Sequence, residues 1–340
     1  MPRKILFVIR GKLGDSLIAH AAVRRYVKAF PWDEVTLLVR RDYARLVRAE
    51  RGFRVVPFGS RLEMAARLLM LPAGRPFDVL AVLWGFGPPV RLVARLVRAR
   101  RRIYLDGRFP DLYPEWPRLG PEATLVDSAS EVIRCFEPTF VKPDALRIES
   151  LARARSAGTD IAVVPLANEL RRNFDGAMLD ALLAEVQRRH PGALIRVLVN
   201  PSDRGASELL QRALPAGVRF VRFTRLAAIL EQYRDIAAWY GTDTGLYHLA
   251  AAMGIPATVF FGPTQPWKIV MPGQREVTWV RLKVLGEAHC DVTSCAQPLC
   301  LEQAVATYCR SSLGRTLEMT PGNCPLRAGT ALEDITVKVA

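Results

Sequence analysis

Short apolar runs alternate with helical stretches along the whole chain, and this alternation restricts the fold more than any other feature. Helical stretches include residues 16–30, 90–98 and 178–190. Candidate strands lie at residues 5–9, 35–39, 55–56, 79–84, 161–165, 195–199, 218–221, 236–239 and 258–261. Strands that are almost wholly apolar are typical of parallel sheets covered by helices on both faces. The sequence therefore predicts an α/β fold.

The alternation starts again near residue 160, after a polar stretch that runs from Glu137 to Asp160. A chain of 340 residues is long enough for two domains, each with its own core. We therefore predict two doubly wound, Rossmann-like domains with mainly parallel sheets facing a cleft, at residues 1–155 and 156–340. Ligands of such sheets bind beyond the carboxyl ends of the strands, so the turns there are the first candidates for a site.

The charge of the chain is strongly positive and unevenly distributed. Its formal net charge is +15, and residues 1–150 hold 27 Lys and Arg against 16 Asp and Glu. This surplus predicts an anionic partner for the first half of the chain. No apolar run is long enough to span a bilayer, and the run at residues 5–9 is too short for a signal peptide. We expect a cytoplasmic protein whose six cysteines are reduced.

The turn after residues 236–239 carries the strongest functional signal. Asp243, Thr244 and Gly245 stand where the first N–H groups of the next helix have no partner, and His248 follows on its first turn. Unpaired N–H groups and the positive end of the helix dipole favour a phosphate there. The alternative is that Asp243 or Thr244 only caps the helix, with His248 packed or solvated.

The turn after the first strand, from Arg10 to Ser16, offers a carboxylate between cations. It lacks the glycine spacing of a dinucleotide fingerprint and the Gly-Lys-Ser/Thr of a P-loop. Asp15, flanked by Arg10 and Lys12, could act as a general base if a substrate hydroxyl reaches it. It could equally be a cap of the helix that follows.

Together the two turns resemble glycosyltransferase family nine, the ADP-heptose heptosyltransferases that build the inner core of lipopolysaccharide. The first-turn pattern of this family, R-x-x-x-(L/M/I)-G-D, resembles Arg10 to Asp15 with one residue fewer. The second-domain pattern, D-(S/T)-G-x-x-H-L-A-A-A-x-G-x-P, matches Asp243 to Pro256. The family's (F/L)-G-P-T follows as Phe261 to Thr264.

The resemblance implies a GT-B fold in which the first domain binds the acceptor and the second binds the nucleotide sugar. It implies Asp15 as the catalytic base. Arg172 stands where the family places a phosphate-binding Lys in K-x-W-P, with Phe174 and Asp175 in place of Trp and Pro. The donor-binding residues implied by the resemblance are Asn168, Arg172, Asp243, Thr244, Gly245 and His248.

The implied chemistry is an inverting, metal-independent transfer of heptose from ADP-heptose to a hydroxyl of an acidic lipopolysaccharide acceptor. No D-x-D carboxylate pair stands at a strand end, so we expect no cofactor. Ser16 to Ala21 departs from the V-(L/V)-H-T-x-P of the family, which leaves the exact acceptor open. The expected partners are an ADP-sugar, an anionic glycolipid and, peripherally, the inner face of the cytoplasmic membrane. The acceptor-binding candidates are Arg10, Lys12, Arg91, Arg95 and Arg98, with Arg100 to Arg102 beside them.

Five of the six cysteines fall in one segment that contains no C-x-x-C pair. They are Cys290, Cys295, Cys300, Cys309 and Cys324. A subgroup of the family that heptosylates serines of autotransporter proteins is similar in having a cysteine finger that holds iron. A structural metal on Cys290, Cys295, Cys300 and Cys309 and a set of reduced, packed thiols are therefore both open.

Three other functions remain as alternatives. A heptosyltransferase that acts on protein Ser or Thr, or on another polysaccharide, would keep the same donor site. A sugar-nucleotide epimerase with GT-B architecture would need no acceptor. A nucleic-acid-binding protein would account for the pI near 10, but the sequence contains no recognition module, so we expect no nucleic-acid partner.

Overall fold

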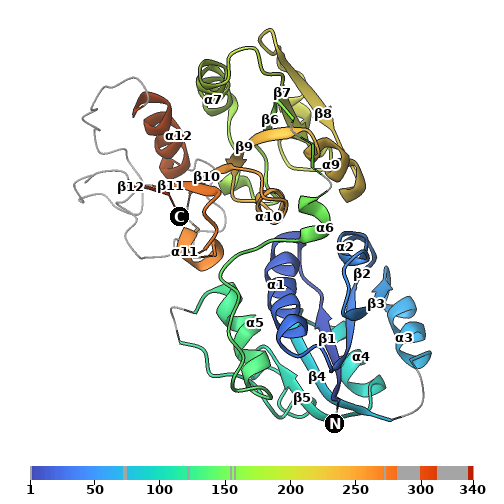
Figure 1. Cartoon of the computed structure of the whole chain (residues 1–340). Helices are drawn as coiled ribbons and strands as arrows, with labels where there is room; N and C mark the ends of the chain where they lie inside the picture. The colour runs from blue at the N-terminus through green and yellow to red at the C-terminus, as the bar shows by residue number, and fades with distance from the viewer. Residues whose placement is uncertain are drawn as a thin grey trace. The chain divides into compact units, whose positions relative to one another are not determined.

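The structure is a computed structural model, and two compact units make it up, Met1–Arg153 and Ala154–Ala340 (Figure 1). It describes residues 2–71, 75–120, 123–153, 155–156, 158–262, 264–271, 273–281, 299–311 and 336–339. Each unit contains its own sheet of mainly parallel strands, with helices packed on it. The predicted α/β class is therefore confirmed. The expected boundary, between residues 155 and 156, lies close to the division after Arg153.

The first unit is a five-stranded parallel sheet in the order β3-β2-β1-β4-β5. The central strand β1 pairs with β2 and β4, so that Ile5 lies beside Val35 and Val79. Its strands are β1 (Lys4–Ile9), β2 (Glu34–Arg40), β3 (Phe53–Phe58), β4 (Phe77–Trp84) and β5 (Ala99–Tyr104). Its helices are α1 (Leu13–Ala29), α2 (Arg41–Val47), α3 (Arg61–Leu69), α4 (Pro88–Leu96), α5 (Leu125–Arg134) and α6 (Glu149–Ala152).

Strand β5 was not predicted, because its run of arginines was interpreted as part of an anion-binding cluster. The structure places these arginines on an edge strand, where each finds a partner within the unit. Arg100 Nη1 lies 3.4 Å from Asp78 Oδ1, and Arg102 Nη2 donates to the Val97 carbonyl at 3.3 Å. Arg101 Nε donates to Glu115 Oε1 at 3.0 Å. An edge strand tolerates charged side chains, so these three residues serve the fold.

The second unit is a seven-stranded sheet in the order β12-β11-β10-β9-β6-β7-β8. Among the described strands, β12 alone runs antiparallel to its neighbour. The strands are β6 (Asp160–Val164), β7 (Ile195–Val199), β8 (Val218–Arg222), β9 (Ile236–Thr242), β10 (Ala257–Phe261), β11 (Val277–Arg281) and β12 (Thr336–Val339). The helices are η1 (Leu170–Arg172, a 3₁₀ turn), α7 (Gly176–Arg189), α8 (Ala206–Leu209), α9 (Leu226–Tyr233), α10 (Gly245–Ala252), α11 (Pro266–Ile269) and α12 (Leu299–Ser311).

Two glycines fix the path of the chain around α10. A Cβ on Gly241 would lie 2.4 Å from the Val164 carbonyl oxygen, so only glycine lets β9 approach β6 at this point. Gly254, with φ of +70°, ends the helix in the left-handed conformation that favours glycine. The Ile255 N–H then donates to the Ala250 carbonyl at 2.9 Å, which closes the helix end. The helix therefore ends at the Gly-x-Pro of the motif.

A fully buried histidine in the core of the first unit predicts how stability changes with pH. The His20 ring meets Tyr43 and Phe53 edge-on, with ring centroids 5.8 and 5.6 Å apart. Burial, with Arg24 adding repulsion, lowers the pKa of His20 to about 3. The unfolded chain keeps a value near 6.5, so unfolding takes up a proton below that pH. We expect this residue to reduce the free energy of unfolding by up to ~1.4 kcal/mol per pH unit below about 6.5.

Urea unfolding between pH 7.5 and pH 5 measures this effect. The His20→Leu variant cannot take up the proton and should lose stability less steeply over the same interval. An unchanged slope in that variant would show that His20 is not buried in its neutral form.

Candidate functional site

Three loops of the second unit meet at the carboxyl edge of its sheet. They follow β6, β9 and β10, which are neighbours in the order β6-β9-β10. The loop after β6 carries Arg172, the loop after β9 carries Asp243, and the loop after β10 carries Thr264. This edge is where doubly wound sheets bind ligands, and it gathers the residues that the sequence motif predicts.

Arg172 lies between two carboxylates from different loops. Its Nη1 donates to Asp243 Oδ2 at 2.9 Å, and its Nη2 donates to Glu169 Oε1 at 2.6 Å. Arg171 Nε also donates to Glu169, at 3.0 Å from Oε2. Glu169 was not predicted, because a carboxylate is unexpected beside a phosphate site. The two carboxylates hold the Arg172 guanidinium in one position, so little side-chain freedom remains to be lost when a ligand binds.

Asp243 is 3% exposed, and its contacts join all three loops. Burial raises the pKa of the Asp243 carboxyl, while the Arg172 charge and a hydrogen bond from the Thr264 side chain act in the opposite direction. Asp243 therefore holds the three loops together. Removal of the Arg172 guanidinium would leave the buried Asp243 carboxylate without a cation.

The N-terminus of α10 presents polar groups that have no hydrogen-bond partner within the described part of the chain. Thr244 is the N-cap residue by position, with extended backbone, yet its hydroxyl makes no capping hydrogen bond. Behind it, Thr242 Oγ1 and Tyr247 Oη are buried and find no hydrogen-bond partner among the described residues. The first N–H groups of a helix are unpaired in the same way. Together these donors favour an anion at the start of α10.

His248 lies one turn into α10 as a neutral, buried imidazole. Burial, with the nearby charge of Arg172 adding to the effect, lowers the pKa of His248 to about 3. Its ring packs against Tyr247, with centroids 3.9 Å apart. Because it is uncharged near neutral pH, His248 can offer a ligand a hydrogen bond but not a positive charge. Arg172 and the helix dipole supply the positive potential.

In the rest of the loop after β6, the Asn168 amide has no partner among the described residues, and the residues from Asn173 to Asp175 have structural roles. Asn168 is exposed and makes no hydrogen bond within the described part of the chain. Asn173 Oδ1 accepts the Ala167 N–H at 2.7 Å, and Phe174 packs on Phe260. Asp175 Oδ1 accepts the Met178 N–H at 2.8 Å and so caps α7. The departures from K-x-W-P at Phe174 and Asp175 therefore serve the core and the helix cap.

In the first unit, Asp15 lies at the carboxyl edge of the sheet beside an aromatic side chain. Asp15 Oδ2 accepts the Lys12 N–H at 3.3 Å. A Cβ on Gly11 would lie 2.4 Å from Trp84 Cδ1 and 2.8 Å from Asp15 Cβ. Glycine at this position therefore lets the turn pass between Trp84 and Asp15. Trp84 was not predicted, because the sequence shows it only as the last residue of an apolar strand.

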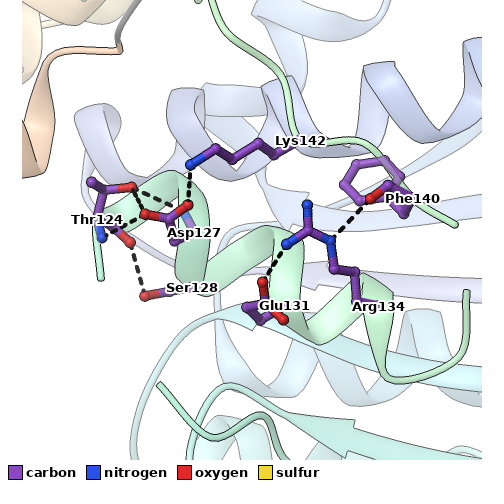
Figure 2. A network of polar contacts seen from close by, with 7 residues as sticks. All are labelled: Thr124, Asp127, Ser128, Glu131, Arg134, Phe140 and Lys142. Atoms are coloured by element: carbon purple, nitrogen blue, oxygen red, sulfur yellow. Dashed lines mark hydrogen bonds and ion pairs between the residues drawn. The ribbon is translucent and has the colours of Figure 1, made fainter. Parts of the chain in front are cut away.

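A second carboxylate at the same helical position shows what a capping role alone looks like. Asp127 is the third residue of α5, as Asp15 is of α1. Figure 2 shows Asp127 accepting hydrogen bonds from Thr124 N at 3.0 Å, Thr124 Oγ1 at 2.7 Å and Lys142 Nζ at 2.6 Å. Burial alone would raise the pKa of the Asp127 carboxyl. These hydrogen bonds outweigh that effect, so the pKa of Asp127 is lowered. Lys12 stands where Thr124 does and cannot accept a hydrogen bond with its side chain, so the α1 turn is a poorer cap.

Cations gather near Asp15 from three neighbouring strand ends. Arg10 follows β1, Arg40 ends β2 and Arg61 begins the helix after β3. Burial lowers the pKa of Arg10, and repulsion from Arg40 and Arg61 adds to the shift. Arg10 Nη1 donates to the Phe86 carbonyl at 3.1 Å, which holds it beside the turn. Arg40 and Arg61 were not predicted, although both stand at strand ends where the fold would have pointed to them.

The other arginines predicted for the acceptor site, two on α4 and one just after it, have different surroundings, and their role in acceptor binding stays a prediction. Arg91 lies over the Phe109 ring, with its guanidinium 4.9 Å from the centroid. Arg95 is exposed in the last turn of the helix. The Arg98 carbonyl accepts the N–H of Phe77, the first residue of β4, so Arg98 lies at the amino edge of the sheet.

The four predicted metal-binding cysteines divide evenly between the described and the undescribed parts of the chain. Cys290 and Cys295, like Cys324, lie outside the described residues. Cys300 and Cys309 lie on α12, and Cys309 Sγ is 3.5 Å from the Ala181 carbonyl oxygen. Within the described ranges, no three His, Cys, Asp or Glu side chains gather in a way that would hold a metal. The four-cysteine set stays a prediction.

Comparisons with known proteins agree with the motif. Residues 151–300 match the model of glycosyltransferase family 9 (heptosyltransferase). No curated protein matches the chain in sequence. The chain is similar to the solved structure of Escherichia coli heptosyltransferase WaaC with ADP, at 18% identity, a TM-score of 0.69 and coverage of 91% of this chain and 99% of that one. E. coli ADP-heptose lipopolysaccharide heptosyltransferase II gives 17% identity, a TM-score of 0.64 and the same coverages.

A third structure, the iron-containing dodecameric glycosyltransferase TibC from enterotoxigenic E. coli, gives 12% identity and a TM-score of 0.58. The match covers 92% of this chain and 77% of that one. At such identities these likenesses show the fold, while the family model covers the residues that build the Arg172–Asp243 site. The resemblance predicted from the sequence is confirmed.

Proposed function

We propose that the protein transfers heptose from ADP-heptose to an anionic lipopolysaccharide acceptor, because residues 151–300 match the model of glycosyltransferase family 9 (heptosyltransferase). The observation that carries the proposal is the α10 N-terminus with its unused Thr244 hydroxyl beside the fixed Arg172 guanidinium. A site of unpaired donors and one positioned cation suits the diphosphate of a nucleotide sugar.

For the donor, we assign the diphosphate to the N–H groups of Gly245 and the next residues, to the Thr244 hydroxyl and to Arg172. The exposed Asn168 amide and the neutral His248 ring offer hydrogen bonds to the sugar or the nucleoside. Adenine as the base is supported by the similar structures of WaaC with ADP and with ADP-2-deoxy-2-fluoro heptose. Arg172 and the helix dipole would stabilise the charge of the leaving ADP, which gives a route without a metal ion.

For the acceptor, the first unit supplies the base and the cations. Asp15 would take the proton of the acceptor hydroxyl as its oxygen attacks the anomeric carbon and the bond to ADP breaks. One displacement inverts the anomeric configuration. Arg10, Lys12, Arg40 and Arg61 would bind the negative charges of the acceptor. We place this reaction in the cytoplasm at the inner face of the membrane. Within the described residues, no helix has the length and apolar character needed to cross a bilayer.

Calorimetric titration with ADP, UDP and GDP in the presence of EDTA tests the donor assignment. We expect ADP to bind with a dissociation constant at least tenfold lower than that of UDP or GDP, and without metal. Preference for UDP would overturn the ADP-heptose assignment, and strict dependence on Mg²⁺ would overturn the metal-independent mechanism.

A further inference from the structure

Helix α3 is apolar on two opposite sides. Met64 and Leu68 are buried in the core of the first unit. On the other side, Leu62, Leu69 and Met70 are 84, 70 and 64% exposed, more than any other large hydrophobic residue in the described part of the chain. Spacings of seven and eight residues put these three on one face. A short helix in water does not gain stability from such a face, so its apolar side points to a partner.

Hollows lined by arginines adjoin this exposed face at Met70. A hollow of about 600 Å³ separates α2 from α3 above strand β3. Its floor includes Phe53 and Val55, and its rim holds Arg41, Arg45, Arg48 and Arg67. A smaller hollow of about 230 Å³ shares Val55 and Arg67 with the first and extends to Arg54 and Met70. The basic rim and the exposed apolar face therefore form one continuous surface, which we call the α2–α3 surface.

Most of the positive charge on the α2–α3 surface is unpaired. Glu63 lies 2.6 Å from Arg41 and 3.6 Å from Arg67, measured from its carboxylate oxygens to the guanidinium nitrogens. Arg45, Arg48 and Arg54 make no ion pair within the described ranges. Strand β3 is at the edge of its sheet, and among the described strands it pairs with β2 alone. A partner of this surface must therefore be anionic and must also accept apolar side chains.

We propose that the α2–α3 surface docks the protein on a bilayer of anionic phospholipid. Leu62, Leu69 and Met70 would enter the boundary between headgroups and acyl chains, while Arg45, Arg48 and Arg54 contact lipid phosphates. An interfacial helix combines an apolar face with flanking arginines in this way. The inference rests on the proposed lipid acceptor, because an enzyme that modifies a membrane lipid must reach the bilayer. These residues are separate from Asp15 and from Arg172.

Co-sedimentation with vesicles tests the proposal on the whole chain. We expect binding to equimolar phosphatidylglycerol and phosphatidylcholine, and little binding to phosphatidylcholine alone. Arg45→Glu/Arg48→Glu should weaken binding by about tenfold or more, since each basic residue near an anionic surface contributes roughly fivefold. Leu62→Ser/Leu69→Ser should weaken it at unchanged charge. Matched controls are Arg219→Glu/Arg222→Glu on exposed β8 and Val141→Ser, which should bind as the wild type does.

Two results would overturn the docking inference. One is equal vesicle binding by the α2–α3 variants and their controls. The other is sedimentation of the free wild-type protein as a dimer that the leucine variant dissociates, because the face would then be an interface between two copies. All variants should keep wild-type affinity for ADP and wild-type transfer to a water-soluble acceptor fragment. If the α2–α3 variants and the wild type all fail to bind vesicles but bind ADP, the docking inference fails and the proposed function stands. If the wild type does not bind ADP, the proposed function fails, whatever the result with vesicles.

Discussion

The Asp15→Asn variant should lose between about 10² and 10⁴-fold in kcat while its affinity for ADP stays at the wild-type value. Removal of a positioned general base typically has an effect of this size, because the acceptor hydroxyl must then lose its proton to water. Asparagine keeps the shape of the side chain and can still accept the Lys12 N–H, so the α1 turn should persist. Steady-state kinetics together with calorimetry on the same preparation measure both quantities.

Asp127→Asn is the matched control, because Asp127 has the same position in α5 that Asp15 has in α1. That variant loses a charged acceptor of Lys142 and Thr124, so it should be less stable by about 1 kcal/mol. Its kcat should not change. If Asp15→Asn behaves like Asp127→Asn, with lower stability and normal turnover, then Asp15 is only a helix cap.

Arg172→Gln should weaken ADP binding and should also lower the free energy of unfolding. Loss of a charged hydrogen-bond donor to a phosphate corresponds to about 2 kcal/mol, or ~30-fold in Kd. The substitution also leaves the buried Asp243 carboxylate without its cation, which destabilises proteins by about 3–5 kcal/mol. The second effect could hide the first if only activity were measured, so calorimetry and urea unfolding are both needed.

A double substitution separates the two effects. Arg172→Gln/Asp243→Asn contains no buried unpaired charge, so much of the lost stability should return, while ADP affinity should stay weak. Arg171→Gln is the control for charge, because Arg171 shares the Glu169 carboxylate with Arg172. It should retain ADP binding. Wild-type ADP affinity in Arg172→Gln at a temperature where the variant is folded would remove Arg172 from the donor site.

The alternation of apolar runs and helices was enough to predict the α/β class and nine of the strands, because strands buried on both faces are apolar throughout. It was not enough for β11 and β12, nor for β5, whose arginines pair at the sheet edge with Asp78 and Glu115. Composition shows which residues are charged, but only the fold shows that these charges already have partners within the unit.

The candidate site was predictable where one turn holds all the residues, as at Asp243 to His248. The site residues were less predictable where they lie on different strands that only the fold brings together. Arg40 and Arg61 are far from Arg10 in sequence, and the strand order β3-β2-β1 brings them to one edge. Glu169 was missed for another reason, since its role is to hold Arg172 rather than to contact a ligand. Such supporting residues carry no motif of their own.

Release of ADP from ADP-heptose, measured with and without a phosphorylated lipopolysaccharide acceptor in the presence of EDTA, tests the central claim most directly. We expect ADP to form only when the acceptor is present, in an amount equal to the heptosylated product, whose new anomeric bond is inverted. Formation of free sugar or of an epimeric sugar nucleotide at the same rate without any acceptor would contradict it.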